Sequence, residues 1–151
     1  MNKKALTLGV VGVLVYSIPV MPVKAASNTD TSVSDSNQAR TAGLICSCSV
    51  SISSGTGKLY ITTETEAFGN MKTIGFKDIS IEYSSDNVHW SEEKQLDDIT
   101  KSGSSYYLNN HSVSVKGGYY YRVSLTHYAK EDGWFGSSQS VPNTSNSVWI
   151  D

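Results

Sequence analysis

A strict alternation of apolar and polar side chains over residues 119–128 is the feature that most restricts the fold of this chain. One parity of this segment comprises Tyr119, Tyr121, Val123, Leu125 and His127. A period of two residues is typical of a β-strand with one buried face, because successive side chains of a strand point to opposite sides of the sheet. The same period recurs in the segments 44–53, 58–67 and 74–83, and Phe68-Gly69-Asn70 is predicted to be a break between the last two.

Further short strands are predicted between turn-forming clusters of Gly, Ser, Asn and Asp, at 88–92, 106–108, 112–115 and 146–150. No segment after the first 25 residues shows a convincing helical period. About seven short strands in roughly 110 residues indicate an all-β fold, an antiparallel two-sheet β-sandwich.

The first 25 residues have the layout of a secretory signal peptide. A short basic start precedes an apolar run from Ala5 to Val20, and Val23-Lys24-Ala25 supplies small residues at positions −3 and −1 of a cleavage site. Cleavage is expected after Ala25, with Ala26 as the alternative. No cysteine follows this site and no apolar tail ends the chain. We therefore expect a secreted, extracellular protein that keeps no membrane anchor after signal cleavage.

The mature chain is predicted to consist of a tether and one domain. Residues 26–42 are rich in Ser, Thr, Asn and Asp and offer too little apolar surface to offset the entropy of ordering them, which predicts a flexible linker. Residues 43–151 form the β-sandwich domain. Signal removal takes away three of the 12 basic residues, so nine remain against 14 acidic ones. An acidic chain without a basic stripe argues against a nucleic-acid partner.

The two cysteines, Cys46 and Cys48, lie one residue apart on the apolar parity of segment 44–53. Side chains two residues apart on a strand are separated by about 6.6 to 6.8 Å, whereas the β-carbons of a disulfide lie about 3.8 Å apart. The alternation therefore favours two inward-pointing thiols that pack as core residues. A Cys-x-Cys disulfide and a metal or redox role remain the alternatives.

Two segments carry a resemblance to known folds. Residues 79–90, with Tyr83-Ser84-Ser85-Asp86-Asn87 and Trp90, resemble the Tyr-Ser-x-Asp-Gly-x-x-Trp hairpin of secreted immunoglobulin-like, fibronectin type III-like and discoidin-like sandwiches, with Asn87 where Gly is usual. Residues 118–125 resemble the penultimate strand of a fibronectin type III-like domain. In such folds a tyrosine at this strand pins a loop through its hydroxyl, and the resemblance implies this role for Tyr119 or Tyr121.

The resemblance has limits along the chain. Segment 58–67 lacks the core Trp usual in fibronectin type III domains, and the opening strand lacks their proline pattern. The chain as a whole also resembles a family of small secreted proteins of Gram-positive bacteria, which implies no particular activity. Function must therefore be argued from side chains rather than from the fold.

Few residues suggest catalysis. Glu92-Glu93 and Asp97-Asp98 are adjacent pairs, and neighbours on a strand point to opposite faces. His127 is the best single candidate for a general base. A histidine near a strand end is more often a hydrogen-bonded structural residue, so we expect no catalytic residue, no cofactor and no metal site. A small secreted enzyme with a site near His127 is the alternative.

Aromatic side chains in loops favour a binding function. Trp134 and Phe135 lie between Gly133 and Gly136 in an expected hairpin loop, and Trp90 and Tyr128 are further candidates. Exposed aromatics on loops of a sandwich offer large, rigid contact surfaces at low entropic cost. The alternative is that Trp134 and Phe135 fold back and cap the core.

The sequence leaves the kind of partner open. A protein partner would favour a convex Trp134-Phe135 knob, whereas a glycan would favour a flat aromatic platform beside residues such as Asn109, Asn110 and Asn143. Self-assembly through an edge strand is a third possibility, indicated by the uncharged runs 113–115 and 148–150.

Overall fold

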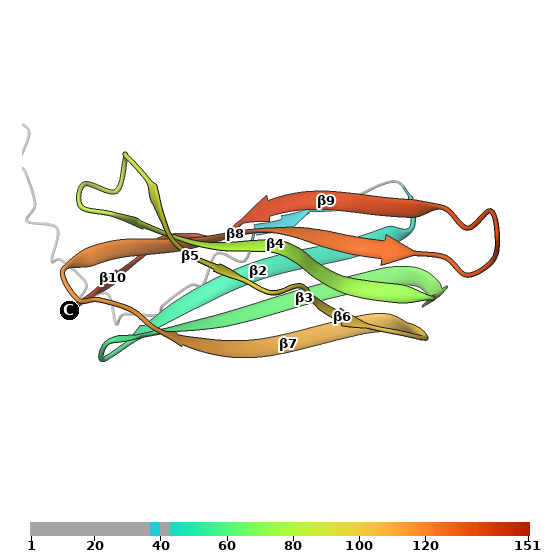
Figure 1. The fold of residues 1–151 in the computed structure, drawn as a ribbon, viewed down its shortest axis with the longest axis horizontal. Helices are drawn as coiled ribbons and strands as arrows, with labels where there is room; N and C mark the ends of the chain where they lie inside the picture. The colour runs from blue at the N-terminus through green and yellow to red at the C-terminus, as the bar shows by residue number, and fades with distance from the viewer. Residues whose placement is uncertain (1–36, 40–42) are drawn as a thin grey trace, which may run out of the picture. The chain divides into compact units, whose positions relative to one another are not determined.

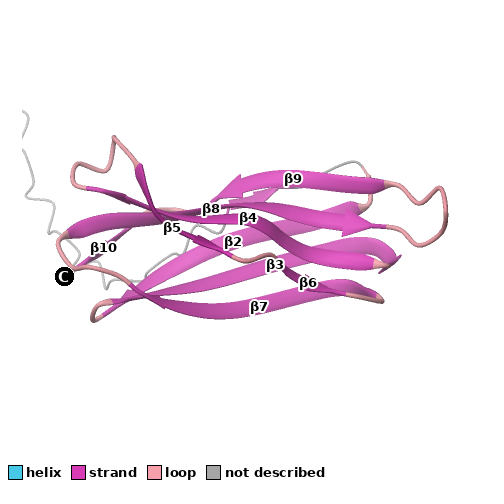
Figure 2. Ribbon diagram, in the orientation of Figure 1, coloured by secondary structure: helices cyan, strands magenta, loops and turns pink. Residues whose placement is uncertain are grey.

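The structure of the chain is a computed structural model that describes residues 37–39 and 43–151. The predicted signal peptide and most of the predicted linker lie outside these residues. Ten strands are present in the described part (Figures 1 and 2): β1 (Asn37–Ala39), β2 (Ile45–Gly55), β3 (Lys58–Met71), β4 (Thr73–Ser84), β5 (Ser91–Leu96), β6 (Ile99–Lys101), β7 (Ser104–Ser114), β8 (Tyr119–Lys130), β9 (Ser138–Thr144) and β10 (Val148–Ile150). Among the described residues no helix is long and apolar enough to cross a membrane.

The strands form two antiparallel sheets, as the alternation predicts. Sheet A has the order β1-β2-β3-β7. Sheet B has the order β10-β8-β4-β5, with β6 also paired to β4 and β9 also paired to β8. The two sheets pack as layers (Figure 1), so the protein is an all-β sandwich.

The core lies between the inner faces of the two sheets. On β3 the buried side chains alternate strictly with exposed or half-buried ones, and the same is true of β8. A larger hydrophobic cluster holds residues such as Leu59, Ile61, Phe76 and Val123, and a smaller one includes Ile45. Burial of these apolar faces is the main favourable contribution to folding.

The start of β2 departs from the predicted alternation. Ile45 and Ser47 pair with consecutive residues of β3, so Cys46 is the extra residue of a β-bulge. The bulge reverses the parity before it, and Ile45 takes the buried place predicted for Cys46. The prediction of two inward cysteines is therefore correct for Cys48, which is buried, and wrong for Cys46, which is half-buried. Both are present as thiols, and no disulfide joins them.

Several strand boundaries and the strand number also differ from the prediction of about seven strands. β3 continues through Phe68-Gly69-Asn70, where a break is predicted, and shifts register after Glu66. The strand predicted at 88–92 begins at Ser91. β9 is not predicted, because its polar residues and Pro142 do not show the apolar alternation of a strand. β1 lies within the range 26–42 predicted to be a linker and pairs with β2.

Tyr121 fixes the connection that leads into β8. Its ring is buried in the core, and its hydroxyl donates a hydrogen bond to the carbonyl oxygen of Lys116 at 2.9 Å. Tyr119 does not make this bond; its ring packs edge-on against Tyr83, with the centroids 5.3 Å apart. Of the two tyrosines singled out from the sequence, Tyr121 therefore ties strand to loop.

Replacement of Tyr121 by Phe is expected to lower the free energy of unfolding by about 0.5–1.5 kcal/mol, because the hydrogen bond to the carbonyl of Lys116 is lost while the ring is retained. Urea unfolding measures the difference. Tyr60→Phe, at a tyrosine exposed on the outer face of sheet A, serves as the control and should change the value by less than about 0.5 kcal/mol. Equal losses in both variants would contradict a structural role for the Tyr121 hydroxyl.

Gly75 permits a close backbone contact within sheet B. It pairs with Thr100 of β6 and Tyr128 of β8. A β-carbon at Gly75 would lie 2.2 Å from the carbonyl oxygen of Ile99 and 2.7 Å from the α-carbon of Thr100. Both are backbone atoms, so no side-chain rotation relieves the clash.

We expect Gly75→Ala to destabilise the fold by about 3 kcal/mol, at the upper end of overpacking costs, and to loosen β6. Gly69→Ala is the matched control, because a β-carbon there meets no atom within 4 Å. Thermal melting of both variants measures the effect. A Gly75→Ala variant as stable as Gly69→Ala would contradict this close packing.

Candidate functional site

The connection between β8 and β9, residues 131–137, is a closed turn held by its own hydrogen bonds. The amide of Glu131 donates to the carbonyl of Ser137 at 2.9 Å, and the Glu131 carboxylate accepts the amide of Ser137 at 3.1 Å. A β-carbon at Gly136 would lie 2.7 Å from the Glu131 carbonyl oxygen, so the turn closes around a glycine. The turn leaves Trp134 and Phe135 at its tip.

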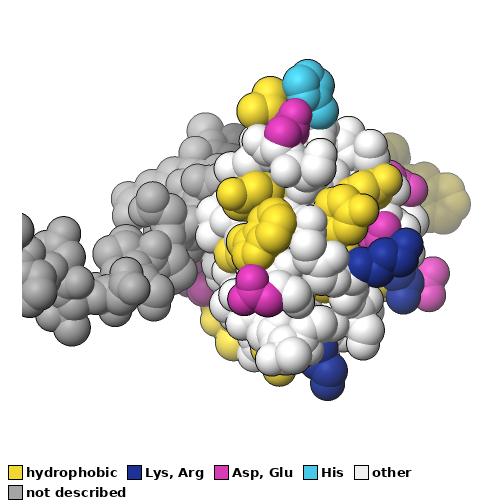
Figure 3. Space-filling model, turned by 90° about the vertical axis from the view of Figure 1, so that its left-hand side faces the viewer, with side chains coloured by type: hydrophobic (Ala, Val, Ile, Leu, Met, Phe, Trp, Pro, Cys, Tyr) yellow, Lys and Arg dark blue, Asp and Glu magenta, His cyan; other side chains and the backbone are white. Residues whose placement is uncertain are grey.

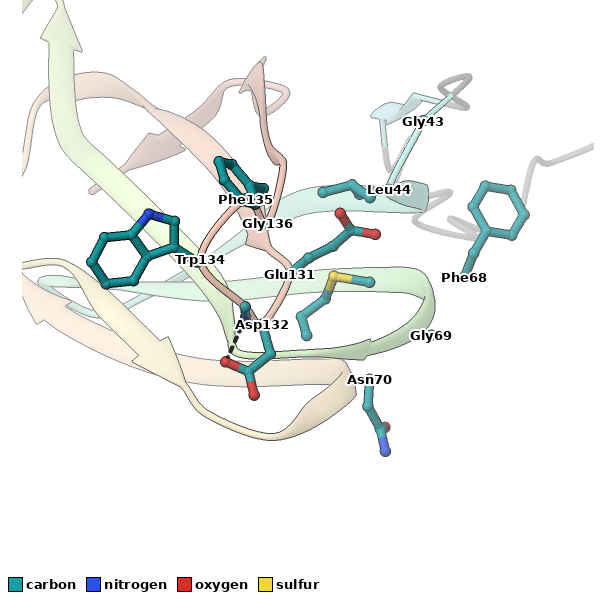
Figure 4. A pocket seen from close by; sticks show the side chains of 12 residues that line it. Gly43, Leu44, Phe68, Gly69, Asn70, Glu131, Asp132, Trp134, Phe135 and Gly136 are labelled. Atoms are coloured by element: carbon teal, nitrogen blue, oxygen red, sulfur yellow. Dashed lines mark hydrogen bonds between the residues drawn. The ribbon is translucent and has the colours of Figure 1, made fainter.

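Trp134 and Phe135 stand almost entirely in solvent, with 95% and 94% of their surfaces exposed. Neither ring caps the core in this structure. Phe68 of β3 is 74% exposed and lies on the other side of a shallow hollow of about 700 Å³ (Figure 4). Leu44 and Glu131 lie between these aromatics. We call this surface, made of Leu44, Phe68, Met71, Trp134 and Phe135, the aromatic end.

Charges at the aromatic end are few and exposed. The carboxylate of Asp132 lies 3.9 Å from the ammonium of Lys72, and both side chains are largely in solvent. An exposed ion pair of this kind stabilises a fold by well under about 1 kcal/mol. The Asp132 side chain also accepts the amide of Gly133 at 2.8 Å. The carboxylates of Glu131 and Asp132 therefore interact with groups at the rim of the hollow and cover neither aromatic ring.

The other two binding candidates lie elsewhere. The ammonium of Lys77 lies 4.0 Å above the ring of Tyr128, on the outer face of sheet B. The guanidinium of Arg122 lies 4.3 Å from the ring of Trp90, next to the turn between β4 and β5. That turn is at the opposite end from residues 131–137 (Figure 1). Trp90 thus forms no common surface with Trp134 and Phe135, and Tyr128 is not among the residues that line the hollow.

The end that holds the β4–β5 turn carries a hydrogen-bonded pair of Asp86 and His89. Figure 3 shows this end, with a histidine beside an acidic side chain at its tip and separate hydrophobic patches below. Asp86 accepts the amides of Val88 and His89, and its carboxylate lies 2.6 Å from the His89 ring. These bonds lower the pKa of Asp86 and raise the pKa of His89. Asn87 has a φ of 59°, which agrees with the predicted turn.

The asparagines proposed for a glycan platform do not gather at the aromatic end. Asn110 accepts a hydrogen bond from Thr62 at 2.9 Å on sheet A, and Asn143 belongs to β9. Asn109 is half-buried on β7. The hollow at the aromatic end is lined by a different asparagine, Asn70. The acidic pairs form no cluster either, and among the described residues no group of three His, Cys, Asp or Glu side chains is placed to hold a metal ion.

His127 lies in the core between the sheets. It is fully buried, and its Nδ1 is 2.7 Å from the hydroxyl of Thr65 on β3, so this bond links sheet B to sheet A. Its ring meets Phe76 edge-on at 5.6 Å, and its Nε2 has no hydrogen-bond partner. Burial lowers the pKa of His127 to about 4. A side chain in this position cannot reach a solute outside the protein.

Phe68 is the surface residue that sequence reasoning missed. The segment Phe68-Gly69-Asn70 is predicted to be a break between strands, so its aromatic ring is not among the predicted binding residues. The available signal was the same as for Trp134 and Phe135: a large aromatic directly beside a glycine.

The chain has no matching family model, no match among curated proteins and no match among solved structures.

The buried, neutral His127 is expected to make the fold sensitive to acid. Between pH 6.5 and about pH 4 the unfolded chain binds a proton at this residue that the folded chain does not, so the free energy of unfolding falls as the pH is lowered. The full effect is at most about 3 kcal/mol. His127→Gln keeps a hydrogen-bonding group for Thr65 but cannot titrate, so it should flatten the dependence over this range.

Urea unfolding at intervals from pH 7 to pH 4 measures the slope. The natural chain, measured in parallel, gives the reference slope. If His127→Gln keeps the slope of the natural chain, His127 is not the titrating group.

Proposed function

We propose that the protein is a secreted, non-catalytic binding module that recognises an extracellular protein through the aromatic end. The observation that carries this proposal is the exposure of Trp134 and Phe135 on a turn fixed by its own hydrogen bonds. Leaving two large apolar rings in water forgoes the stabilisation of burying them. Contiguous exposed apolar surface of this kind marks interaction sites in soluble proteins.

The shape of the aromatic end supports a protein partner over a glycan. Trp134 and Phe135 project from a turn, and Phe68 adds a third ring across the hollow. Aromatic anchors that project into a partner's pocket are typical centres of protein interfaces. The arrangement expected for a glycan site, a flat ring beside Asn109, Asn110 and Asn143, is not assembled with Trp134.

The proposal includes an immunoglobulin-like or fibronectin type III-like character for the sandwich. The hydroxyl bond of Tyr121 to the backbone of Lys116 supports it, because the tyrosine corner of such folds makes a bond of this kind. The hairpin between β4 and β5, with Asp86 accepting the amides of its turn, supports it as well. Domains of this type place binding residues on loops at one end, which agrees with the use of residues 131–137.

Binding is tested with the purified full chain on arrays of extracellular proteins and, in parallel, of glycans. We expect protein ligands whose affinity falls at least tenfold in Trp134→Ala, a loss of about 1.4 kcal/mol or more. Because Trp134 is 95% exposed, the melting temperature should change little. Trp149→Ala, at a tryptophan that is 42% exposed on β10, is the matched control and should keep the affinity.

Three results would contradict the proposal. Glycan ligands that depend on Trp134 would move the site to the other class of partner. Protein ligands that bind Trp134→Ala as tightly as the natural chain would place the interface away from the aromatic end. A large fall in the melting temperature of Trp134→Ala would show that the ring is part of the core in solution.

A further inference from the structure

The strands at the borders of the two sheets differ in how they are protected against pairing with another chain. β1, β6 and β10 have three residues each, too few for extended pairing. β5 carries Glu92, Glu93 and Lys94 and has a register shift against β4. β9 contains Pro142. Short length, charge, irregular register and proline are the devices by which natural edge strands avoid association.

β7 is neither short nor charged and has no proline, and its one register shift against β3 lies at its start, between Ser104 and Tyr106. It has 11 residues, Ser-Ser-Tyr-Tyr-Leu-Asn-Asn-His-Ser-Val-Ser, with no Asp, Glu, Lys, Arg, Pro or Gly. From Tyr106 to Ser114 it pairs with β3 without a register shift. In the described part of the chain, β3 is its one partner strand, so its other border presents backbone groups of a regular strand.

We propose that β7 pairs antiparallel with β7 of a second copy of this chain, about a two-fold axis at Asn109. Asn109 is the midpoint of Ser104–Ser114, so this register pairs the whole strand. Leu108 then lies opposite Asn110 of the second copy, and Tyr106 opposite Ser112. A two-fold axis of this kind produces a closed dimer in which both copies use the same surface.

The composition of β7 favours a second copy as the occupant. When β7 pairs with itself, each of its side chains faces a side chain of β7 in the second copy. Because β7 has no Asp, Glu, Lys or Arg, no like charges face one another across this pair. The two Leu108 side chains, each 43% exposed on the outer face, become diagonal neighbours across the new pair. On the inner side, His111 borders a hollow of about 340 Å³ whose other lining residues, 94–97 and Ile99, belong to β5, to β6 and to the segment between them. The pairing joins two copies of sheet A into one continuous sheet.

This interface is independent of the aromatic end. β7 begins at Ser104, near the end that holds residues 131–137 (Figure 1). Because the two β7 strands run in opposite directions, the two aromatic ends of the dimer point away from each other. A dimer of this form carries two separate binding surfaces, and its formation does not depend on whether they bind a protein.

Sedimentation equilibrium of the purified full chain, from micromolar to several hundred micromolar, tests the proposal. We expect a reversible monomer–dimer equilibrium. In the dimer of Leu108→Lys, the two introduced lysines are diagonal neighbours at the axis, and in Asn110→Glu the two introduced glutamates are. Because like charges repel, each substitution should raise the dimer dissociation constant at least tenfold. Ser53→Lys, also exposed on the outer face of sheet A but on β2, adds the same charge as Leu108→Lys and should leave the constant unchanged.

An equal mixture of Leu108→Lys and Asn110→Glu tests the register. In the mixed dimer the introduced lysine of one copy lies directly opposite the introduced glutamate of the other, so dimers should form again. Circular dichroism checks that each variant is folded. A natural chain that stays monomeric throughout the range overturns the proposal. A dimer dissociation constant that is the same in Leu108→Lys, Asn110→Glu and Ser53→Lys overturns it as well. If the mixture has a dissociation constant no lower than that of either variant alone, the register is wrong.

Discussion

The burial of one face of sheet A against one face of sheet B is the interaction on which the rest of the structure depends. β3 supplies Leu59 and Ile61, and β8 supplies Val123 and Leu125, all from strands whose alternate side chains point inward. Each buried side chain of this size stabilises the folded state by roughly 1.5–3 kcal/mol. The polar contacts between the sheets follow from this packing. The bond between Thr65 and His127 exists because both side chains occupy inward positions of these two strands.

Regular stretches of the chain were predictable from sequence and irregular ones were not. β8 shows why the prediction succeeds: every second residue from Tyr121 to Ala129 is buried, as a period of two requires. β2 shows why it fails, because an extra residue at Cys46 leaves no mark in the sequence and yet exchanges the two faces before it. β9 escaped prediction because its border position tolerates Pro142, which would be excluded from a central strand.

The candidate site was predictable in part for the same reasons. Trp134 and Phe135 lie beside glycines outside any alternating segment, a position that left exposed rings and rings capping the core as alternatives, and the structure exposes both rings. Phe68 was missed because β3 continues across Gly69 instead of ending before it. The alternation of β8 already placed His127 on the inward side, and burial makes it a core residue with a depressed pKa rather than a base that faces solvent. The spatial separation of Trp90 from Trp134 depends on topology, which local patterns do not report.

The crossing of the chain from sheet A to sheet B is unusually tight. β3 ends at Met71 and β4 begins at Thr73, so Lys72 alone connects the two layers beside the aromatic end. The wall of the hollow that carries Met71 and Phe68 is therefore anchored to both sheets, and it moves only if long paired strands bend. The wall that carries Trp134 and Phe135 is attached through the ends of β8 and β9 and through the exposed ion pair of Asp132 with Lys72. If the aromatic end binds ligands of different shapes, the turn at residues 131–137 adjusts to them while the side that carries Phe68 stays in place.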